Sequence, residues 1–535
     1  MMTRLSAAVS TFAILVLMLG MRAEANTDFA LIDSDGVFHN MSWYNDKEQI
    51  ALLVASADSS EEVKAAFFAK VELHPEMQFF ILNPTGESRD TVHNLAHADV
   101  PVLMDDAKIV SKALGVTELN EVLFMDVKSF KVTKQAAVVS EQAITYEWGT
   151  PSYVADVAPI IENNCAMCHR DGGVAPFSMD SHLMLKGWSP MIKEVISTKR
   201  MPPGQLDPHV GSFTNSRTLS VEDQQKLVAW IDAGAPNDAT DVDPLAEITW
   251  PDTKWDRRLG EPDLIVKVPP MEIPATGVLD YIDITVDMGL EEDRWVRASE
   301  WIPSAPSVLH HSLNALVEPG KRGGSVLAAI DGRTSDMPDL AAYVPGGEAS
   351  IYPENAGGLL KAGTKMALNL HYTTNGKAET DESEIGVWFY PKGYVPEERI
   401  TGICACIFPG EWVNIPPNDP SYVQVKKVTY QNKTELQSFL PHMHFRGKSM
   451  KAYAEYPDGT EEMLINVANY SYDWQLAYEF SPPKILPAGT VVRVEGEFDN
   501  STRNPANPDP ERSVPWGQMS WDEMFFGAMT WKIVE

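Results

Sequence analysis

The pattern of apolar residues changes twice along this chain of 535 residues, which excludes a single fold of one class. Residues 27–140 alternate apolar runs with amphipathic stretches, and residues 150–237 carry apolar residues at helical spacing. Residues 260–535 consist of short β-type runs separated by Pro and Gly turns. A chain of this length is also too long for one hydrophobic core. The sequence therefore predicts a multidomain protein.

The first region predicts an α/β layer fold with a partly parallel sheet, because candidate strands and helices alternate in it. Residues 100–126 resemble the C-terminal half of the thioredoxin and peroxiredoxin family, which implies a thioredoxin-like domain over residues 27–140. This region contains no cysteine, so thiol–disulfide exchange is excluded there and we expect a docking or structural role. Its histidines could bind a metal, although solvated or capping roles are favoured; they are His74, His93 and His97.

Residues 165–169 read Cys-Ala-Met-Cys-His, the pattern of covalent c-type haem attachment. Cys165 and Cys168 would form thioethers to the two vinyl groups, and His169 would then ligate the iron. Zinc binding and thiol redox chemistry are rival uses of such a motif, but no second cysteine pair lies near it to complete a zinc site. The sequence therefore predicts one covalently attached haem c in a small all-α domain over residues 150–237.

Helical periodicity on both sides of the motif supports this domain. Residues 152–164 form a candidate helix that runs into the motif, and residues 219–234 form a second, with Ser220 as its N-cap. The domain resembles the class I cytochromes c, in which a downstream methionine supplies the second axial ligand. Met201, in an extended loop with two following prolines, is the candidate for that role. The alternatives are His209, Met184 and Met191.

Short strands and turns recur throughout the second half of the chain and predict two β-sandwich domains of jelly-roll type. We expect the first over residues 260–400 and the second over residues 401–535. An acidic linker near residues 237–262 precedes them. This half of the chain is therefore expected to be all β.

All five histidines beyond residue 209 lie in this half, in patterns typical of metal ligands. His310 and His311 are adjacent, His371 stands alone, and His442 and His444 are separated by one residue. Residues i and i+2 of a strand face the same side, so the last pair can reach one ion together. The pattern predicts metal ligands in both sandwiches, with His310, His311 and His371 in the first and His442 and His444 in the second.

Four motifs in this half, VLHHSL, LNLHYT, PHMHFRGK and DEMFFG, resemble those of the copper type II, ascorbate-dependent monooxygenases. This family includes the peptidylglycine and dopamine hydroxylating enzymes, and the resemblance spans about residues 260–535. It implies two copper ions. The first would be held by His310, His311 and His371. The second, where O₂ binds and the substrate C–H bond breaks, would be held by the catalytic set His442, His444 and Met524.

The ligand types agree with copper chemistry. Imidazole suits copper in either oxidation state, and a thioether favours Cu(I), the state that must meet O₂. Met519 and Met529 are local rivals of Met524, but only Met524 follows Asp-Glu as in the family. The second set is therefore expected to contain one soft ligand.

The chain also departs from the family. The animal enzymes carry several disulfides in this core, whereas only Cys404 and Cys406 are present here; two residues apart, they are expected to be buried free thiols. Leu440 stands where the peptide-amidating enzyme has an arginine that binds the substrate carboxylate, which disfavours a glycine-extended peptide. Arg446 and Lys448, after the histidine pair, are expected to face solvent.

Composition and the N-terminus bear on location. Lys and Arg number 43 against 75 Asp and Glu, and the net charge of −32 disfavours nucleic acid and anionic membranes as partners. Arg4, the apolar run 12–19 and Ala-Glu-Ala at 23–25 predict a signal peptide over residues 1–25. No apolar run is long enough to span a bilayer stably. The mature protein is therefore expected to be periplasmic or secreted.

Together these features predict an exported copper-dependent monooxygenase that hydroxylates a C–H bond of a small organic substrate with O₂. Electrons would arrive singly through the fused haem, which takes the place of ascorbate, with an external donor upstream. The alternative is a copper and haem protein that carries electrons or senses redox state without hydroxylation. The sequence identifies neither the substrate, the reductant nor the oligomeric state.

Overall fold

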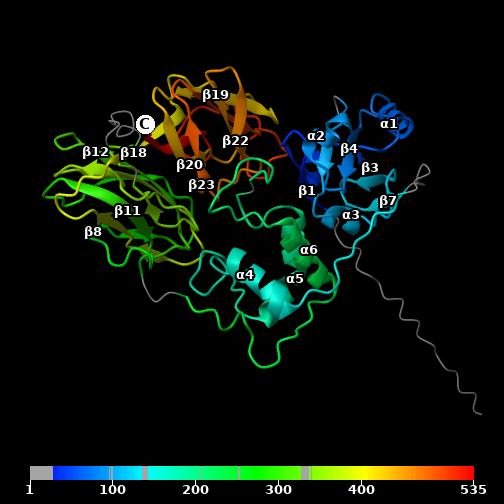
Figure 1. Ribbon diagram of the computed structural model, residues 1–535, viewed down its shortest axis with the longest axis horizontal. Coiled ribbons are helices and arrows are strands. Elements are labelled where there is room, and N and C mark those ends of the chain that lie inside the picture. The colour runs from blue at the N-terminus through cyan, green and yellow to red at the C-terminus, as the bar shows by residue number, and fades with distance from the viewer. Residues whose placement is uncertain are drawn as a thin grey trace, which may run out of the picture.

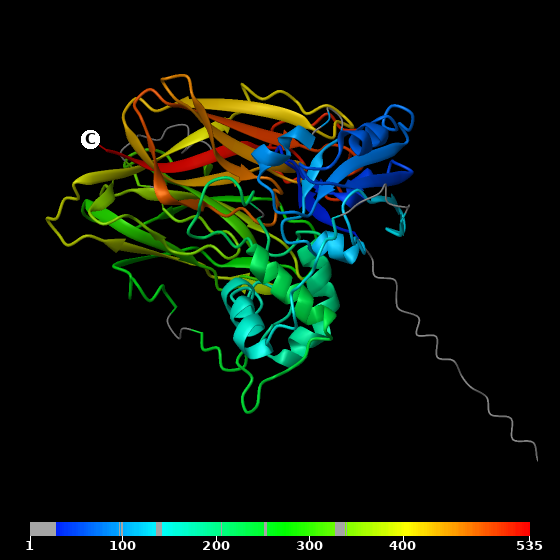
Figure 2. The same cartoon turned by 45° about the vertical axis from the view of Figure 1, so that its right-hand side comes forward.

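The computed structural model describes most of the chain downstream of the predicted signal peptide, which lies outside the described residues. The described ranges are 28–95, 97, 100–134, 142–204, 206–250, 254–326, 337–338 and 340–534. An α/β region, a helical region and a large β-rich part are visible in Figures 1 and 2. Among the helices of the described ranges, none has the length and hydropathy that crossing a membrane requires.

The α/β region confirms the predicted partly parallel sheet. Its five strands run in the order β5-β4-β3-β6-β7; β3, β4 and β5 are parallel, whereas β6 and β7 are antiparallel. Their bounds are Gln49–Val54 (β3), Met77–Asn83 (β4), Val102–Met104 (β5), Val122–Asp126 (β6) and Val132–Lys134 (β7). A hairpin of β1 (Ala30–Ile32) and β2 (Phe38–Asn40) precedes them. The central strand β3 is buried beyond Gln49, as expected of a strand covered on both faces.

Short helices connect these strands. Ser60 caps the first, α1, because its hydroxyl accepts a hydrogen bond from the Val63 amide. The helices are α1 (Glu61–Phe68), α2 (Arg89–Val92) and α3 (Ile109–Ala113), with 3-10 turns η1 (Met41–Tyr44) and η2 (His93–Leu95). Strand and helix order thus agree with the sequence prediction.

The helical region contains three α-helices and a π-helical turn: η3 (Tyr153–Val157), α4 (Ala158–Asn164), α5 (His182–Ser197) and α6 (Val221–Asp232). Helices over 152–164 and 219–234 were predicted, and Ser220 caps α6 by accepting from the Asp223 amide at 3.0 Å. Helix α5 was missed, since Pro190 lies inside it and obscures the pattern. Buried residues of this region share one hydrophobic core with the α/β region.

Among its described residues, the second half of the chain is dominated by strands, as predicted, although Val326 is helical. One sheet runs β23-β20-β25-β18-β14-β11-β17-β8, with β13 paired to β11. It is faced by β10-β15-β12 in the first half and by β19-β24-β21-β22 in the second, and each half buries its own hydrophobic core. The two layered halves are joined because β14 and β18 pair in parallel. Strand β18 therefore crosses residue 401, where the sequence places a domain boundary.

The bounds of these strands follow. In the first half they are β8 (Leu264–Lys267), β9 (Met271–Ile273), β10 (Ile282–Asp287), β11 (Arg294–Ile302), β12 (Leu309–Val317), β13 (Ser350–Ile351), β14 (Ala356–Leu360), β15 (Lys365–Tyr372), β16 (Glu379–Asp381) and β17 (Glu384–Phe389). From the crossing strand onward they are β18 (Glu398–Ile407), β19 (Tyr422–Thr429), β20 (Thr434–His442), β21 (Gly447–Glu455), β22 (Glu461–Val467), β23 (Tyr478–Leu486), β24 (Val491–Phe498) and β25 (Phe525–Ile533).

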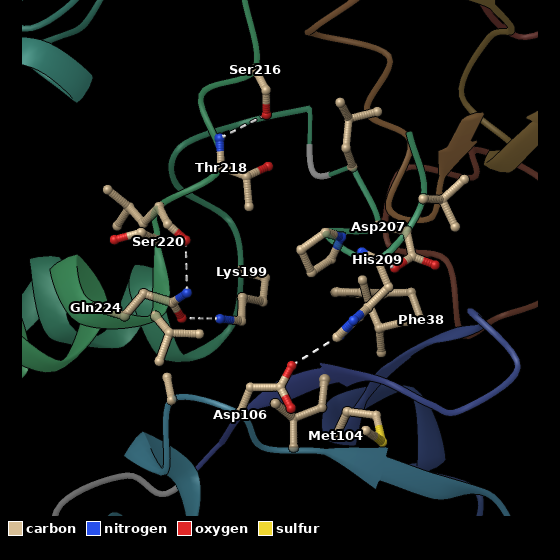
Figure 3. Close-up of a pocket in the computed structure, with 18 of the residues that line it drawn as sticks. Phe38, Met104, Asp106, Lys199, Asp207, His209, Ser216, Thr218, Ser220 and Gln224 are labelled. Atoms are coloured by element: carbon tan, nitrogen blue, oxygen red, sulfur yellow. Dashed lines mark hydrogen bonds and ion pairs between the residues drawn. The ribbon is translucent and has the colours of Figure 1, made fainter. Parts of the chain in front are cut away.

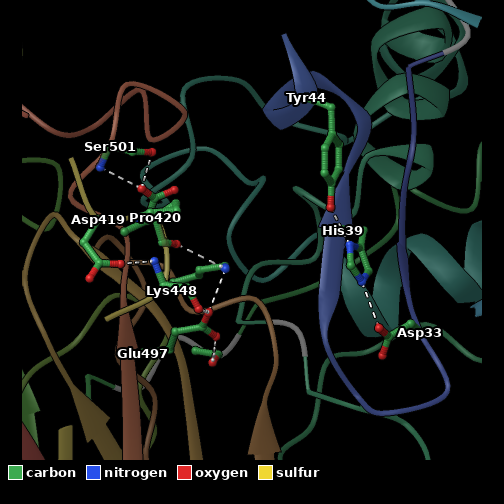
Figure 4. A network of polar contacts seen from close by, with 11 residues as sticks. Asp33, His39, Tyr44, Asp419, Pro420, Lys448, Glu497 and Ser501 are labelled. Carbon is green, nitrogen blue, oxygen red and sulfur yellow. Dashed lines mark hydrogen bonds and ion pairs between the residues drawn. The ribbon is translucent and has the colours of Figure 1, made fainter. Parts of the chain in front are cut away.

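Polar contacts fix the α/β region to the second β half. Asn466 donates to the Gly36 carbonyl at 2.8 Å, and Arg503 pairs with Asp46 at 2.8 Å. Figure 4 shows the two sides of this junction: His39 bridges Tyr44 and Asp33 on one side, and Lys448 pairs with Glu497 at 2.7 Å on the other. Lys448 is thus held by a carboxylate rather than free in solvent, which corrects its predicted role.

Candidate functional site

The first histidine set is assembled by two neighbouring strands of the first β half. His311 on β12 pairs directly with His371 on β15. Consecutive residues of a regular strand face opposite sides, yet the Nδ1 atoms of His310 and His311 are 2.9 Å apart. The register of β12 against β15 shifts between Leu309 and His311, and an irregularity of this kind redirects a side chain. The strand irregularity therefore brings all three rings to one side.

The geometry of this set suits a metal ion. One ring nitrogen from each of His310, His311 and His371 can be chosen so that all lie within 4.8 Å of one another. The Nδ1 atoms of His371 and His310 are 3.3 Å apart. Burial and the neighbouring histidines lower the pKa of His371 to about 3 and that of His311 well below its ordinary value. The His311 and His371 rings are therefore neutral, which is the form that binds metal.

The second set occupies the end of β20 in the second β half. The rings of His442 and His444 have centroids 5.2 Å apart, and both side chains are buried. Neither Nε2 atom has a hydrogen-bond partner within the described part of the chain. Each Nδ1 is engaged instead, with the Gln475 side-chain oxygen for His442 and with the Asp522 carbonyl, at 3.3 Å, for His444.

In both rings Nδ1 is hydrogen-bonded and Nε2 is without a partner in the described ranges, which is the arrangement found in metal-binding histidines. One nitrogen is fixed by an outer partner, and the other is left as the ligand. A buried nitrogen without a partner is otherwise costly. Burial also lowers the pKa of His442 to about 4, so its ring is neutral. The residues present therefore fit a second metal ion held through the two Nε2 atoms.

Met524 immediately precedes β25, the strand that pairs with β20. His442 is opposite Phe526 at the end of that pairing, and its ring stacks on the Phe526 ring with centroids 5.6 Å apart. Residues opposite each other in antiparallel strands share a face. Met524 is buried, with 4 % of its surface exposed, in a cluster with Cys406 and Phe526. The structure thus places Met524 in one cluster with Phe526, whose ring stacks on that of His442.

The two histidine sets lie next to each other. The ring centroids of His311 and His442 are 5.9 Å apart. Tyr281 and Tyr472 line the junction: Tyr281 stacks on His371 at 4.3 Å, and its hydroxyl is 2.9 Å from that of Tyr472. Residues separated by more than 130 positions in the chain thus form one cluster.

One short segment, residues 472–475, contacts both sets. The Tyr472 hydroxyl is 3.0 Å from His371 Nδ1, and the Asp473 carboxylate is 3.0 Å from His310 Nε2. Gln475 orients His442 and also donates to the Tyr472 carbonyl at 2.8 Å. Sequence reasoning missed this segment, because nothing in the order Tyr-Asp-Trp-Gln indicates which distant histidines it meets.

The haem-attachment motif begins where α4 ends. The His169 amide donates to the Cys165 carbonyl at 2.9 Å, so the chain turns tightly through the motif. Cys165 and Cys168 are not joined by a disulfide. His169 Nδ1 donates to the Phe177 carbonyl at 3.1 Å, which leaves Nε2 to serve as a ligand. The residues present therefore fit a covalently held haem with one histidine ligand.

The candidates for the second axial ligand lie in different surroundings. His209 Nε2 is 3.0 Å from Asp106 and lines a cavity of about 480 Å³ between the α/β and helical regions, as Figure 3 shows. Met201 follows α5, and its residue surface is 42 % exposed. His209 is thus committed to a partner in the α/β region, which favours Met201.

Two further expectations for the second β half were wrong. Cys404 and Cys406 form a disulfide within β18 rather than remaining free thiols. Arg446 is fully buried rather than facing solvent. Its guanidinium donates to Asn500 at 2.7 Å and to the Trp521 carbonyl at 2.9 Å, so it fixes the chain just before Met524. A buried charge needs such partners, and the sequence does not reveal them.

Comparison with known proteins adds fold similarity for the N-terminal part alone. No family model matches the chain, and no curated protein does. Among solved structures, the exposed lipoprotein thioredoxin Etrx1 of Streptococcus pneumoniae is 20% identical over 21% of this chain and 91% of its own, with a TM-score of 0.18. Peroxidoxin BcpB of Mycobacterium tuberculosis is 18% identical over 21% and 83%, with a TM-score of 0.17. We draw nothing about activity from likenesses of this size.

Proposed function

We propose that the protein is an exported copper-dependent monooxygenase that receives its electrons through a covalently attached haem c. The observation that carries the proposal is the single cluster of five histidines. Three of them bring ring nitrogens within 4.8 Å, and two others present buried Nε2 atoms without partners. With Met524 as the soft ligand, the donors would be those that copper takes in both of its oxidation states.

The reaction proposed is R–H + O₂ + 2 e⁻ + 2 H⁺ → R–OH + H₂O, with a small organic substrate. Copper, when bound, would supply O₂ activation. The chain's own residues orient the ligands and limit water: Gln475 and the Asp522 carbonyl fix the His442 and His444 rings, and both rings are fully buried. Leu440, an apolar residue on β20 before the histidine pair, argues against a substrate carboxylate held there by an ion pair.

The two electrons that the reaction needs must come from outside the copper sites. A c-type haem carries one electron at a time, and Cys165, Cys168 and His169 are the residues that would hold it, with Met201 as the second axial ligand. Contact of the helical region with the β-rich half supports this role. Residues 212–215 run along the edge strand β23, with the Thr214 amide donating to the Glu479 carbonyl at 3.0 Å.

The compactness of the cluster favours one alternative, an electron-transfer or redox-sensing protein without hydroxylation. The His311 and His442 rings are 5.9 Å apart, and Tyr281 and Tyr472 hydrogen-bond to each other beside them. Such a site needs no substrate cleft between the two β halves. The alternative keeps the same ligands and the same haem.

Metal analysis combined with oxygen uptake tests the proposal. Protein from a host that matures c-type cytochromes should contain two coppers and one haem, and a Cys165→Ala, Cys168→Ala variant should lose the haem band on a denaturing gel. Reduced wild type should consume O₂ faster when supplied with a suitable small substrate and release hydroxylated product. Colourless protein would refute the haem part of the proposal. Protein that binds copper but consumes no oxygen with any member of a substrate panel would refute the hydroxylase part.

A further inference from the structure

Trp474 lies where three parts of the molecule meet. It belongs to segment 472–475, whose other members contact His371, His310 and His442. Only 7 % of its surface is exposed. Its neighbours in the chain, Asp473 and Gln475, therefore contact histidines of the two sets, whereas the indole of Trp474 packs against other residues.

Two glycines show what the indole packs against. A Cβ at Gly204 would lie 2.4 Å from the indole, and so would a Cβ at Gly346. Both glycines also have positive φ, +70° and +73°. Gly204 closes the Met201 loop of the helical region, whereas Gly346 belongs to the first β half. The indole is thus enclosed between the backbone of these two regions.

Arg217 completes the junction from the haem-binding side. Its guanidinium lies 5.4 Å from the Trp474 ring centroid and 3.7 Å from Cys168 Sγ. It also donates to the Gly346 carbonyl at 2.8 Å. Cys168 is a proposed haem-attachment residue, so the haem-binding side reaches Trp474 through Arg217.

On the copper side, the path continues through the two residues before Trp474. The Tyr472 ring stacks on His310 with centroids 4.8 Å apart, and Asp473 accepts from His310 Nε2. Contacts therefore run without interruption from Cys168 through Arg217 and Trp474 to His310. Electron transfer is fastest along covalent bonds and close contacts, so a continuous path of this kind is favoured over a gap of similar length.

We propose that Trp474, positioned by Arg217, is the contact through which single electrons pass from the haem-binding region to the three-histidine set. This inference rests on the proposed function, because it requires both a haem and copper. In the step, one electron leaves the ferrous haem and reduces one cupric ion to cuprous; no proton or atom is transferred. Trp474 is called a positioning residue because it is not proposed as a ligand of either metal. It connects Arg217 on the haem-binding side to Asp473, which contacts His310.

The experiment follows the haem absorbance without O₂, so its readout is independent of hydroxylase activity. Protein with Cu(II) and ferric haem is flash-reduced at the haem, and reoxidation by the copper is timed. Trp474→Leu should slow this step by about tenfold or more, equivalent to about 1.4 kcal/mol of barrier. Trp474→Phe, which keeps an aromatic ring, should slow haem reoxidation less than Trp474→Leu does. Arg217→Gln should also slow haem reoxidation, because it removes the guanidinium that lies between Cys168 and Trp474. Trp531→Phe, on β25 beside Tyr430, is the matched control.

The controls separate the failure of this inference from the failure of the proposed function. If wild type reoxidises no faster than a His310→Ala, His311→Ala variant, the haem does not serve copper and the proposed function falls. If wild type is fast and Trp474→Leu equals Trp531→Phe, with copper content and haem potential unchanged, the route through Trp474 is refuted. Should Trp474→Leu lose either cofactor, Trp474→Phe and Arg217→Gln decide: wild-type rates in both refute the route.

Discussion

The two histidine sets differ in how their rings are held, although they lie side by side. The first set depends on a strand irregularity that turns two adjacent residues toward one point, and its Nδ1 atoms converge. The second set uses the last residue of β20 and a residue just beyond it; both Nδ1 atoms are tied to fixed partners, and both Nε2 atoms lack a partner among the described residues. The first set is also completed from the opposite β half, by Tyr472 and Asp473.

The histidine rings of the two proposed copper sites are therefore held with unequal rigidity. Gln475, which fixes His442, is buried, whereas the Asp473 side chain, which contacts His310, is 84 % exposed. An exposed ion pair is weak because water screens it. The second site should therefore depend strongly on its outer partner, and the first site only weakly.

Removing a ligand should have the largest effect and show whether the two sets bind metal separately. His442→Ala should lose the second copper and abolish oxygen chemistry while the first copper stays bound. His310→Ala should lose the first copper and block electron delivery, yet leave the second. Copper content by atomic absorption, with electron paramagnetic resonance of each variant, checks this. Loss of both metals in every variant would show that the five histidines form one coupled site. This outcome is the main alternative because the His311 and His442 ring centroids are only 5.9 Å apart.

Replacing the thioether tests the chemical asymmetry between the sets. Met524→Leu should weaken Cu(I) binding at the second set much more than Cu(II) binding, since thioethers are soft ligands. Competition with a Cu(I)-specific chelator measures the change. Met519→Leu is the matched control, because it alters a methionine five residues earlier that does not follow Asp-Glu. An equal effect of the two substitutions would mean that Met524 is a core residue and not a ligand.

Changing the outer partners should have a smaller and unequal effect. Gln475→Ala should lower copper affinity at the second set by about 10- to 100-fold, the usual loss when such a partner is removed. Asp473→Ala should cost the first set distinctly less, because its carboxylate is solvated. Isothermal titration of apo-protein with copper compares the two variants. A greater loss in Asp473→Ala would reverse the proposed order of rigidity.

The smallest effect is expected outside both sets, in the α/β region. Burial raises the pKa of Asp105 from 3.8 to about 6, opposed by a hydrogen bond from the Ser111 amide. The folded state then binds this proton more tightly than the unfolded state, so the contribution of Asp105 to stability is greatest at low pH and falls as pH rises from 3.8 to about 6. Asp105→Asn should flatten this part of the stability curve, measured by chemical denaturation, without changing copper binding. An unchanged curve would show that Asp105 titrates normally.

Agreement between sequence and structure was closest where the signal is local. The helical pattern over residues 219–234 located α6 within two residues at each end, and Ser220 was identified as a cap from its neighbours alone. Helix α5 was missed because an internal proline contradicts its local pattern. Cys404 and Cys406 were assigned as free thiols, since spacing alone does not show whether two sulfurs meet.

The sequence by itself determined which residues have the chemistry to bind metal and haem, because ligand identity and spacing are written in the chain. It could not determine that five histidines from two β halves form one cluster, nor that Tyr472, Asp473 and Gln475 surround it. It also gave no sign that Arg446 is buried or that Trp474 meets Gly204 and Gly346. These facts depend on contacts between residues far apart in the chain, which packing of the two β halves and the helical region alone creates.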